Sequence, residues 1–213
     1  MAKYRKDVPL TMQPRDSAWC GAACAHMLAR YYGMRISLRR LVRELRVGSS
    51  GILTPKLGTW FLEHGFDVTI VGYEDAFPNR FIALDAEEAQ AEVLKWCARE
   101  TQDLSWHRKA LRRVYPSFFE AGGKLLPRPV TRRDIRNALR RDQPPILAVD
   151  VVTLYLTREW TDPHFVVVTG MHRDRIALND PYPDYGGAVE YDLDRFLHAC
   201  YRTNGEALFI KPR

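Results

Sequence analysis

The sequence predicts an α+β fold, because helical patterns come mainly first in the chain and strand patterns mainly second. Apolar residues recur at three- and four-residue spacing through residues 20–65, as they do on amphipathic helices. Short runs rich in β-branched residues follow at 146–152 and 165–170, and such runs are typical of buried strands. A chain of 213 residues can bury a substantial core, so we expect one domain, residues 1–213, with a sizeable insertion.

The helical half of the expected domain covers residues 8–73. Gly33 is a natural end for the first helix, Ser37 can cap the second, and Pro55 suits the first turn of the third. Alternating apolar and polar residues after Gly65 predict a strand. The predicted elements are helices at 20–32, 38–46 and 54–65 and a strand at 66–71.

The composition changes between about residues 74 and 128. Residues 85–102 are rich in Ala, Glu and Leu and predict a long helix, and residues 105–115 predict another. Gly122-Gly123 and the prolines after it end the segment. We interpret 74–128 as a helical insertion that covers the functional site, and the alternative is that it forms part of the core scaffold.

The sheet half covers residues 130–213. Thr131 and Asp134 form a near capping-box pattern that predicts the start of a helix, and Pro144-Pro145 marks its end. A turn at 172–174 joins two strands into an antiparallel hairpin. The expected strands are 146–152, 164–170, 175–181, 189–191 and 206–211, with a helix at 193–200.

Composition and charge exclude several classes of protein. With 46% hydrophobic and 27% charged residues the chain is typical of soluble globular proteins. No apolar run has the length of a signal-peptide core or a membrane span, so we expect a cytoplasmic protein. The net charge of +6 includes pairs such as Arg132-Arg133 on predicted amphipathic helices, which favours solvated helix faces over a nucleic-acid surface.

The cysteines do not indicate a metal site. The chain has four of them, and they form neither a CxxC pair nor a metal-ligand spacing with histidine. A disulfide framework is not expected in a cytoplasmic chain. The sequence therefore predicts no metal and no organic cofactor. The four residues are Cys20, Cys24, Cys97 and Cys200.

Cys20 stands where a helix is expected to begin. A thiol in this position lies near unpaired backbone N–H groups and the positive end of the helix dipole, which lower its pKa. The same N–H groups can hold a developing oxyanion, and Gln13 in the preceding loop is placed to add a side-chain donor. Gly21 leaves room for a substrate backbone. The alternative is that Cys20 is an inert packing residue, as most buried cysteines are.

His164 is the expected base for this thiol, because it enters an apolar strand at the edge of a core. A hairpin centred on residue 172 places positions 164 and 180 opposite each other. The Asp180 carboxylate would then lie beside the imidazole, an arrangement that orients a base and determines its tautomer. Taken singly, His164 can instead be a packed histidine and Asp180 a turn residue. A nucleophilic cysteine site is favoured by four residues occurring together in suitable settings: Gln13, Cys20, His164 and Asp180.

Three motifs carry a resemblance to a known family. They are Gln13-x6-Cys-Gly-Ala-Ala-Cys-x2-Met-Leu-x2-Tyr-Tyr-Gly, then Asp162-Pro-His-Phe-Val-Val-Val-Thr-Gly, and finally Leu178-Asn-Asp-Pro. Together they resemble the papain-like cysteine peptidases of the C39 type, a family that includes bacteriocin-processing domains that cleave leader peptides after a double glycine. The resemblance covers residues 8–73 and 130–211 and leaves out 74–128.

The resemblance implies a papain-like fold in which the Cys helix packs on an antiparallel sheet. By position it implies that Cys20 is the nucleophile and His164 the general base and acid. Asp180 would orient the histidine, and Gln13 would complete the oxyanion hole with the Cys20 backbone N–H. The gap from Gln13 to Cys20 is one residue longer than the usual pattern. Papain itself uses Asn as orienter, so Asn179 stays open beside Asp180, which the strand alternation and the family pattern favour.

The predicted function is that of a cysteine peptidase, or more broadly a thiol amidohydrolase, that cleaves a peptide or amide bond through an acyl-enzyme. One alternative keeps the thioester but passes the acyl group to an amine, which would make the protein an acyltransferase or ligase. Another alternative is a non-catalytic C39-like module that binds a peptide. In each case the expected partner is a peptide or an amide, and no nucleic acid or membrane is expected.

Overall fold

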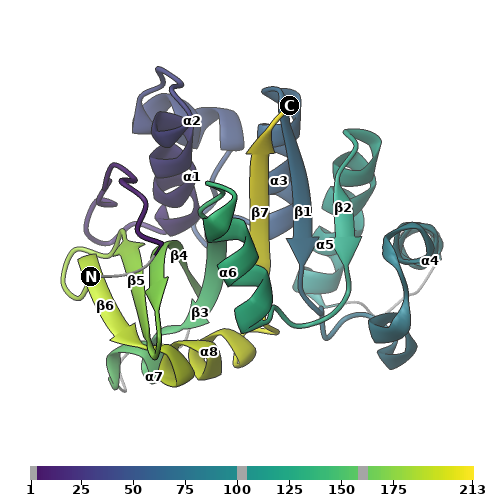
Figure 1. The fold of residues 1–213 in the computed structure, drawn as a ribbon. Coiled ribbons are helices and arrows are strands. Elements are labelled where there is room, and N and C mark those ends of the chain that lie inside the picture. The colour runs from purple at the N-terminus through teal and green to yellow at the C-terminus, as the bar shows by residue number, and fades with distance from the viewer. Residues whose placement is uncertain (1–3, 100–104, 158–162) are drawn as a thin grey trace.

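The computed structural model describes residues 4–99, 105–157 and 163–213. Within these ranges seven strands form one mixed sheet, in the order β2-β1-β7-β3-β4-β5-β6, and helices cover both of its faces (Figure 1). The α+β class predicted from the sequence is therefore confirmed. Asp162, and the last residues of the helix expected at 85–102, lie outside the described residues.

The N-terminal elements follow the predicted order closely. They are α1 (Cys20–Tyr31), α2 (Leu38–Leu45), α3 (Thr54–Glu63) and β1 (Phe66–Val71). Ser37 caps α2 as expected, because its hydroxyl accepts a hydrogen bond from the Arg40 backbone N–H at 3.3 Å. No side chain in the described residues caps α1, whose N-cap position is Trp19. The N–H groups of its first turn are therefore available to other groups.

The segment from 74 to 128 contains helices and one strand. Its elements are η1 (Asn79–Ala83), α4 (Ala86–Ala98), α5 (Trp106–Glu120) and β2 (Lys124–Leu126). The predicted end of α5 at residue 115 was wrong, since the helix continues through Pro116. Proline costs a helical hydrogen bond, but Phe118 and Phe119 lie beyond it and are buried in the core, which favours continuation. β2 was not predicted; it is three residues long and pairs in parallel with β1.

The C-terminal half supplies most of the sheet. Its elements are α6 (Arg132–Arg140), β3 (Ile146–Asp150), α7 (Val151–Tyr155), β4 (Pro163–His172), β5 (Arg175–Asp180), β6 (Gly187–Asp192), α8 (Leu193–Tyr201) and β7 (Ala207–Pro212). The strand predicted at 146–152 ends early, because Asp150 caps a short helix that the sequence pattern did not reveal. Its Oδ2 accepts a hydrogen bond from the Thr153 backbone N–H at 3.0 Å.

β4 and β5 form the predicted antiparallel hairpin, with one difference in register. Near the turn His172 pairs with Arg175, and further along Val167 pairs with Asn179. Between these pairs β4 carries a bulge at Val168–Gly170. Continued past this bulge, the register places position 180 opposite position 166 rather than 164. Asp180 is therefore a diagonal neighbour of His164, which is still within reach of a long side chain.

The core lies on both faces of the sheet. Figure 1 shows α6 and α8 on one face and α1, α3 and α5 on the other. β3 serves both layers, because Ile146 and Ala148 belong to one apolar cluster and Leu147 and Val149 to the other. This double burial explains why the strand is a continuous apolar run.

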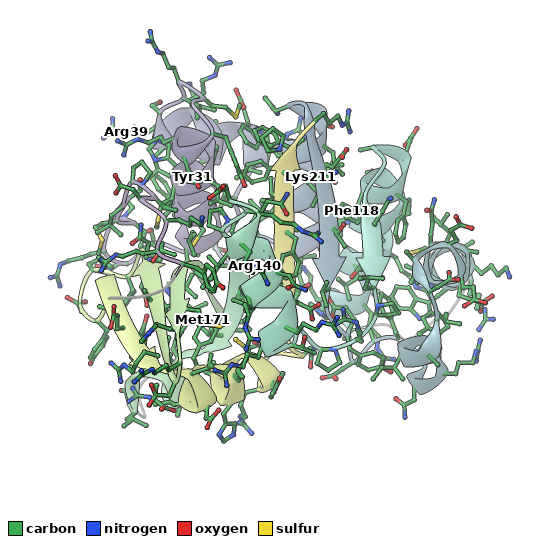
Figure 2. The ribbon with its side chains drawn as sticks, viewed as in Figure 1. Tyr31, Arg39, Phe118, Arg140, Met171 and Lys211 are labelled. Atoms are coloured by element: carbon green, nitrogen blue, oxygen red, sulfur yellow. The ribbon has the colours of Figure 1, made fainter. Side chains whose placement is uncertain are left out.

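The surface carries the charge of the predicted amphipathic helices. Arg39 on α2 and Arg140 on α6 are exposed (Figure 2). In the part of the chain that the structure describes, no helix has both the length and the apolar character needed to cross a membrane.

Candidate active site

Cys20 is the first residue of α1, and the close packing behind it requires a glycine. A Cβ atom on Gly21 would lie 2.6 Å from Ile52 Cγ2 and 3.2 Å from Phe165 Cδ2, which is too close for a normal contact with Ile52. Gly21 therefore seats the first turn of α1 against β4 and the loop before α3. The structure thus gives this glycine a packing role in addition to the access predicted from the sequence.

His164 lies at the start of β4 and is fully buried. Its Nε2 is 2.8 Å from Asp180 Oδ1, and the ring lies close enough to the Cys20 thiol for the two groups to shift each other's pKa. β3 lies alongside, where Val149 is the partner of His164 in the antiparallel ladder. The structure thus brings Cys20, His164 and Asp180 together in one place.

Asp180 ends β5 and is also fully buried. Besides His164, two donors satisfy its carboxylate: the Tyr155 hydroxyl at 2.6 Å from Oδ2, and the Tyr182 backbone N–H at 3.0 Å from Oδ1. A buried carboxylate needs such donors, because it has lost its hydration. The sequence patterns did not single out Tyr155, which lies on the unpredicted helix α7.

Asn179 faces away from His164. Its Nδ2 donates a hydrogen bond to the Val8 carbonyl at 2.7 Å, which ties the N-terminal segment to the sheet. Neighbouring residues on a strand point to opposite faces, so only one of Asn179 and Asp180 can reach the imidazole. In this structure that residue is Asp180.

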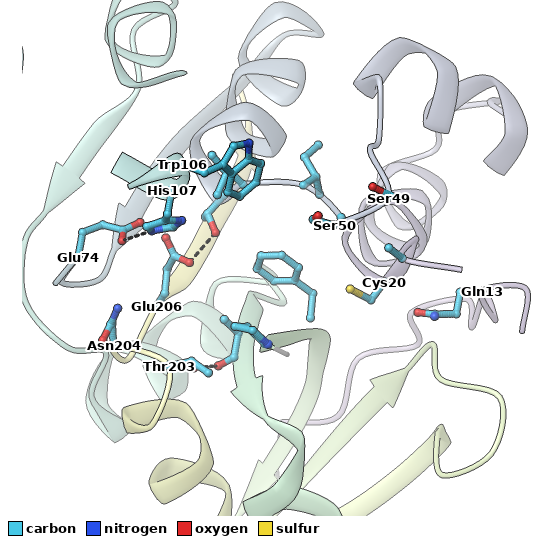
Figure 3. Close-up of a pocket in the computed structure, with 18 of the residues that line it drawn as sticks. Gln13, Cys20, Ser49, Ser50, Glu74, Trp106, His107, Thr203, Asn204 and Glu206 are labelled. Carbon is cyan, nitrogen blue, oxygen red and sulfur yellow. Dashed lines mark hydrogen bonds and ion pairs between the residues drawn. The ribbon is translucent and has the colours of Figure 1, made fainter. Parts of the chain in front are cut away.

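Gln13 lies beside Cys20, with its carboxamide turned toward the thiol (Figure 3). Its backbone N–H donates to the Pro181 carbonyl at 2.9 Å, and the side chain is only 5% exposed. The Nε2 atom donates to the Ser17 carbonyl at 2.6 Å, while Oε1 is buried and has no hydrogen-bond partner among the described residues. One hydrogen of the predicted donor group is therefore already used within the loop.

The electrostatics distinguish Cys20 from the other cysteines. Burial opposes ionisation of the Cys20 thiol, but hydrogen bonding and the charge of His164 outweigh it, so the pKa of Cys20 is lowered. Burial raises the pKa of Cys97 to about 11 and raises those of Cys24 and Cys200 as well. Cys20 is therefore the most readily ionised thiol of the four.

The imidazole shows the complementary shift. Burial by itself would lower the pKa of His164, but the hydrogen bond to Asp180 and the nearby Cys20 thiol raise it to about 9. A lowered thiol pKa and a raised imidazole pKa together favour a thiolate–imidazolium pair near neutral pH.

Cys20 opens into a cleft of about 540 Å³. Gln13 and Ser17 line it near the thiol, while Glu74, His107 and Glu206 line it farther away (Figure 3). Trp106 and His107 belong to α5, so the 74–128 segment contributes to the wall of the cleft. Among the described residues, no group of three or more His, Cys, Asp or Glu side chains is arranged to hold a metal ion.

A protein-family model supplies the decisive comparison. The model of the Peptidase_C39 like family matches residues 5–208, which is nearly the whole chain. The chain belongs to this family. Its match runs across residues 74–128, and the interpretation of that segment as an insertion stays a prediction. No curated protein matches the chain.

Solved structures of C39 peptidases share the fold. A double glycine motif protease from an AMS/PCAT transporter, in complex with the leader peptide, has a TM-score of 0.54 at 17% identity. The match covers 98% of this chain and 94% of the protease chain. The peptidase domain of Streptococcus ComA, a bifunctional ABC transporter, has a TM-score of 0.54 at 16% identity, and the match covers 97% of this chain and 99% of that domain. A putative C39-like peptidase from Bacillus anthracis has a TM-score of 0.51 at 13% identity, and the match covers 100% of this chain and 97% of that peptidase.

These comparisons confirm the fold and the family that the sequence motifs indicated. At such low identities the structural similarity shows the fold alone. This member of the Peptidase_C39 like family has the papain-like arrangement in which the helix bearing Cys20 packs against the sheet, as α1 does on β4.

Proposed function

We propose that this C39-like protein is a cysteine peptidase, or more broadly a thiol amidohydrolase, with Cys20 as nucleophile and His164 as general acid and base. The observation that supports the proposal most directly is the grouping of Cys20, His164 and Asp180, with 2.8 Å between His164 Nε2 and Asp180 Oδ1. The opposite pKa shifts of the thiol and the imidazole support the same assignment.

The proposed reaction begins with the thiolate–imidazolium pair. Cys20 Sγ attacks the carbonyl carbon of the scissile amide and forms a tetrahedral intermediate. The C–N bond breaks as His164 gives its proton to the leaving amine, and a thioester to Cys20 remains. His164, now neutral, takes a proton from water as the water attacks the thioester. The carboxylic acid leaves, and the thiolate and imidazolium are restored.

The other proposed roles belong to positioning and charge stabilisation. Asp180 holds the imidazole in one orientation and stabilises its charged form. The Cys20 backbone N–H, at the uncapped start of α1, is one donor to the oxyanion. Gln13 is the second donor, through the Nε2 hydrogen that does not serve Ser17.

We propose a peptide as the substrate. The cleft beside Cys20 is large enough for a ligand, and a structural neighbour was solved in complex with a leader peptide. A reactive thiol has to stay reduced, which agrees with the cytoplasmic location that we propose.

Labelling with iodoacetamide at neutral pH, followed by peptide mass mapping, tests the nucleophile. We expect one dominant adduct at Cys20 in the wild type, no adduct at that position in Cys20→Ala, and slower labelling of Cys20 in His164→Ala. Cys97→Ala is the matched control, because Cys97 is half-buried with a raised pKa, and its loss should leave the labelling rate unchanged. Equal labelling of all four cysteines would contradict the proposal.

The same site supports a second candidate function, acyl transfer to an amine. Incubation of a substrate peptide with and without added glycinamide separates hydrolysis from acyl transfer. Hydrolysis gives a product with a free carboxylate, and transfer gives a product joined to glycinamide through an amide bond. A non-catalytic peptide-binding module would bind peptides but give neither product.

A further inference from the structure

The cleft that contains Cys20 continues to a second set of ionisable side chains. We call this set the acidic end of the cleft; it consists of Glu74, Glu206, His107 and Thr54. The four residues come from four places in the chain: the loop after β1, the residue before β7, the first turn of α5 and the start of α3. Figure 3 shows Glu74, His107 and Glu206 grouped at the end of the cleft away from Cys20, and Thr54 is hydrogen-bonded to Glu206.

The carboxylates outnumber the cation that the protein provides for them. Glu74 Oε2 lies 3.3 Å from His107 Nε2, and Glu206 Oε2 accepts a hydrogen bond from the Thr54 hydroxyl at 2.6 Å. Glu74 is only 9% exposed, and Glu206 is half-buried. Two carboxylates therefore share one histidine in a poorly hydrated place.

This deficit of positive charge affects protonation. Burial and the nearby Glu74 carboxylate raise the pKa of Glu206 to about 8. The hydrogen bond to Glu74 raises the pKa of His107. Burial and the neighbouring Glu74 thus favour the protonated form of Glu206 near neutral pH, and an entering cation would favour its ionised form.

Two features suit this cleft to a ligand, one at each end. At the thiol end, Gln13 Oε1 is a buried acceptor without a partner among the described residues, and it belongs to the same cleft. At the acidic end, Trp106 is 68% exposed and stands next to His107 on the cleft wall (Figure 3). An exposed indole face favours cations and the aliphatic stems that carry them.

We propose that the acidic end of the cleft is a specificity subsite that binds a cationic group of the substrate, the side chain of Lys or Arg, through Glu74 and Glu206. This inference rests on the proposed function, since it assumes that the chain bound across Cys20 extends along the cleft. The cation replaces the missing positive charge, and the Trp106 ring covers its aliphatic stem. The subsite selects substrates and takes no part in bond cleavage.

Peptide profiling tests the subsite. The probes are hexapeptides with acetylated N-termini that place Lys, Arg, norleucine or Glu at each position in turn, with a parallel set whose N-termini are free. We expect wild-type kcat/KM to favour Lys or Arg over norleucine by about tenfold or more at one position, since a buried charge pair discriminates at that level. If the preference appears only with free N-termini, the subsite takes a terminal ammonium, and the side-chain assignment is overturned.

Matched variants assign the preference to the carboxylates. Glu206→Gln and Glu74→Gln should reduce the preference to less than about threefold, while kcat/KM for the norleucine peptide stays near the wild-type value. Glu63→Gln removes an exposed carboxylate from α3 away from the cleft, and it should keep the full preference. A preference that survives in both cleft variants, or no preference for a cation at any position, overturns the proposal. Thermal unfolding of each variant verifies its fold.

A binding measurement separates this inference from the proposed reaction. Isothermal titration calorimetry with the Cys20→Ala protein compares the Lys and norleucine members of each pair without any cleavage. Tighter binding of a Lys peptide, lost in the Cys20→Ala/Glu206→Gln double variant, supports the subsite even if the wild type hydrolyses nothing. Equal binding of the two peptides at every position counts against the subsite, whatever the wild type cleaves.

Discussion

Tyr155→Phe tests how the buried Asp180 carboxylate is stabilised. The Tyr155 hydroxyl donates to Asp180 Oδ2 at 2.6 Å, and Asp180 is fully buried. The substitution keeps the ring and removes only the donor, so the carboxylate loses one of three hydrogen bonds at a fully buried position. A hydrogen bond to a charged group contributes about 1.5–3 kcal/mol, and we expect the free energy of unfolding to fall by that amount. For a chain of this size the melting temperature should fall by about 3–12 °C.

Tyr185→Phe is the matched control for this experiment. Its ring stacks on Tyr155 at a centroid distance of 5.0 Å, but Tyr185 is 47% exposed, and its hydroxyl has no hydrogen bond within the described residues. Loss of that hydroxyl should change the free energy of unfolding by less than about 0.5 kcal/mol. Urea denaturation of the two variants and the wild type gives both values.

The labelling rate of Cys20 gives a second measurement on Tyr155→Phe. Asp180 keeps the hydrogen bonds from His164 and from the Tyr182 backbone, so labelling should slow less than it does in Asp180→Asn. If Tyr155→Phe and Tyr185→Phe unfold with the same free energy, the Tyr155 bond does not stabilise Asp180, and the account of three donors is refuted.

Four further predictions address the neighbouring residues. The thiolate–imidazolium pair exists above the lowered pKa of Cys20 and is lost as the pH rises through the His164 pKa of about 9. Asp180→Asn removes the carboxylate that raises the His164 pKa, so the alkaline limb of the plot of Cys20 labelling rate against pH should move to lower pH. Asn179→Ala should leave that limb in place. It should lower the free energy of unfolding by about 1–3 kcal/mol, because the buried Val8 carbonyl loses its hydrogen-bond donor. A shifted limb would show that Asn179 also acts on the imidazole. Gly21→Ala should destabilise the protein by about 1–3 kcal/mol in thermal unfolding, since the new methyl overlaps Ile52, and an unchanged melting temperature would show that Ile52 moves aside freely. Gln13→Ala should lower kcat by about 100-fold in a peptide hydrolysis assay, and wild-type kcat would show that Gln13 serves only the Ser17 loop.

Local patterns predicted most of the elements because their signals lie within one segment. The alternation at 66–71 and the apolar run at 165–170 both lie in strands, and Ser37 and Thr131 cap the helices that they were expected to cap. The elements missed were short. β2 and α7 have three and five residues, too few for a periodic signal, and they are held by pairing with β1 and by the Asp150 cap.

The sequence by itself determined which residue types were available to the site, and their order indicated the family. Only the tertiary structure decided which of them meet. The β4 bulge and the strand pleat together direct Asp180, not Asn179, at His164, and α7 brings the Tyr155 hydroxyl to the same carboxylate. Glu74, His107 and Glu206 are far apart in the chain and carry no shared motif, so the acidic end of the cleft could not be predicted. The physical reason is that local propensity acts over a few residues, whereas the meeting of side chains depends on register and packing between distant segments.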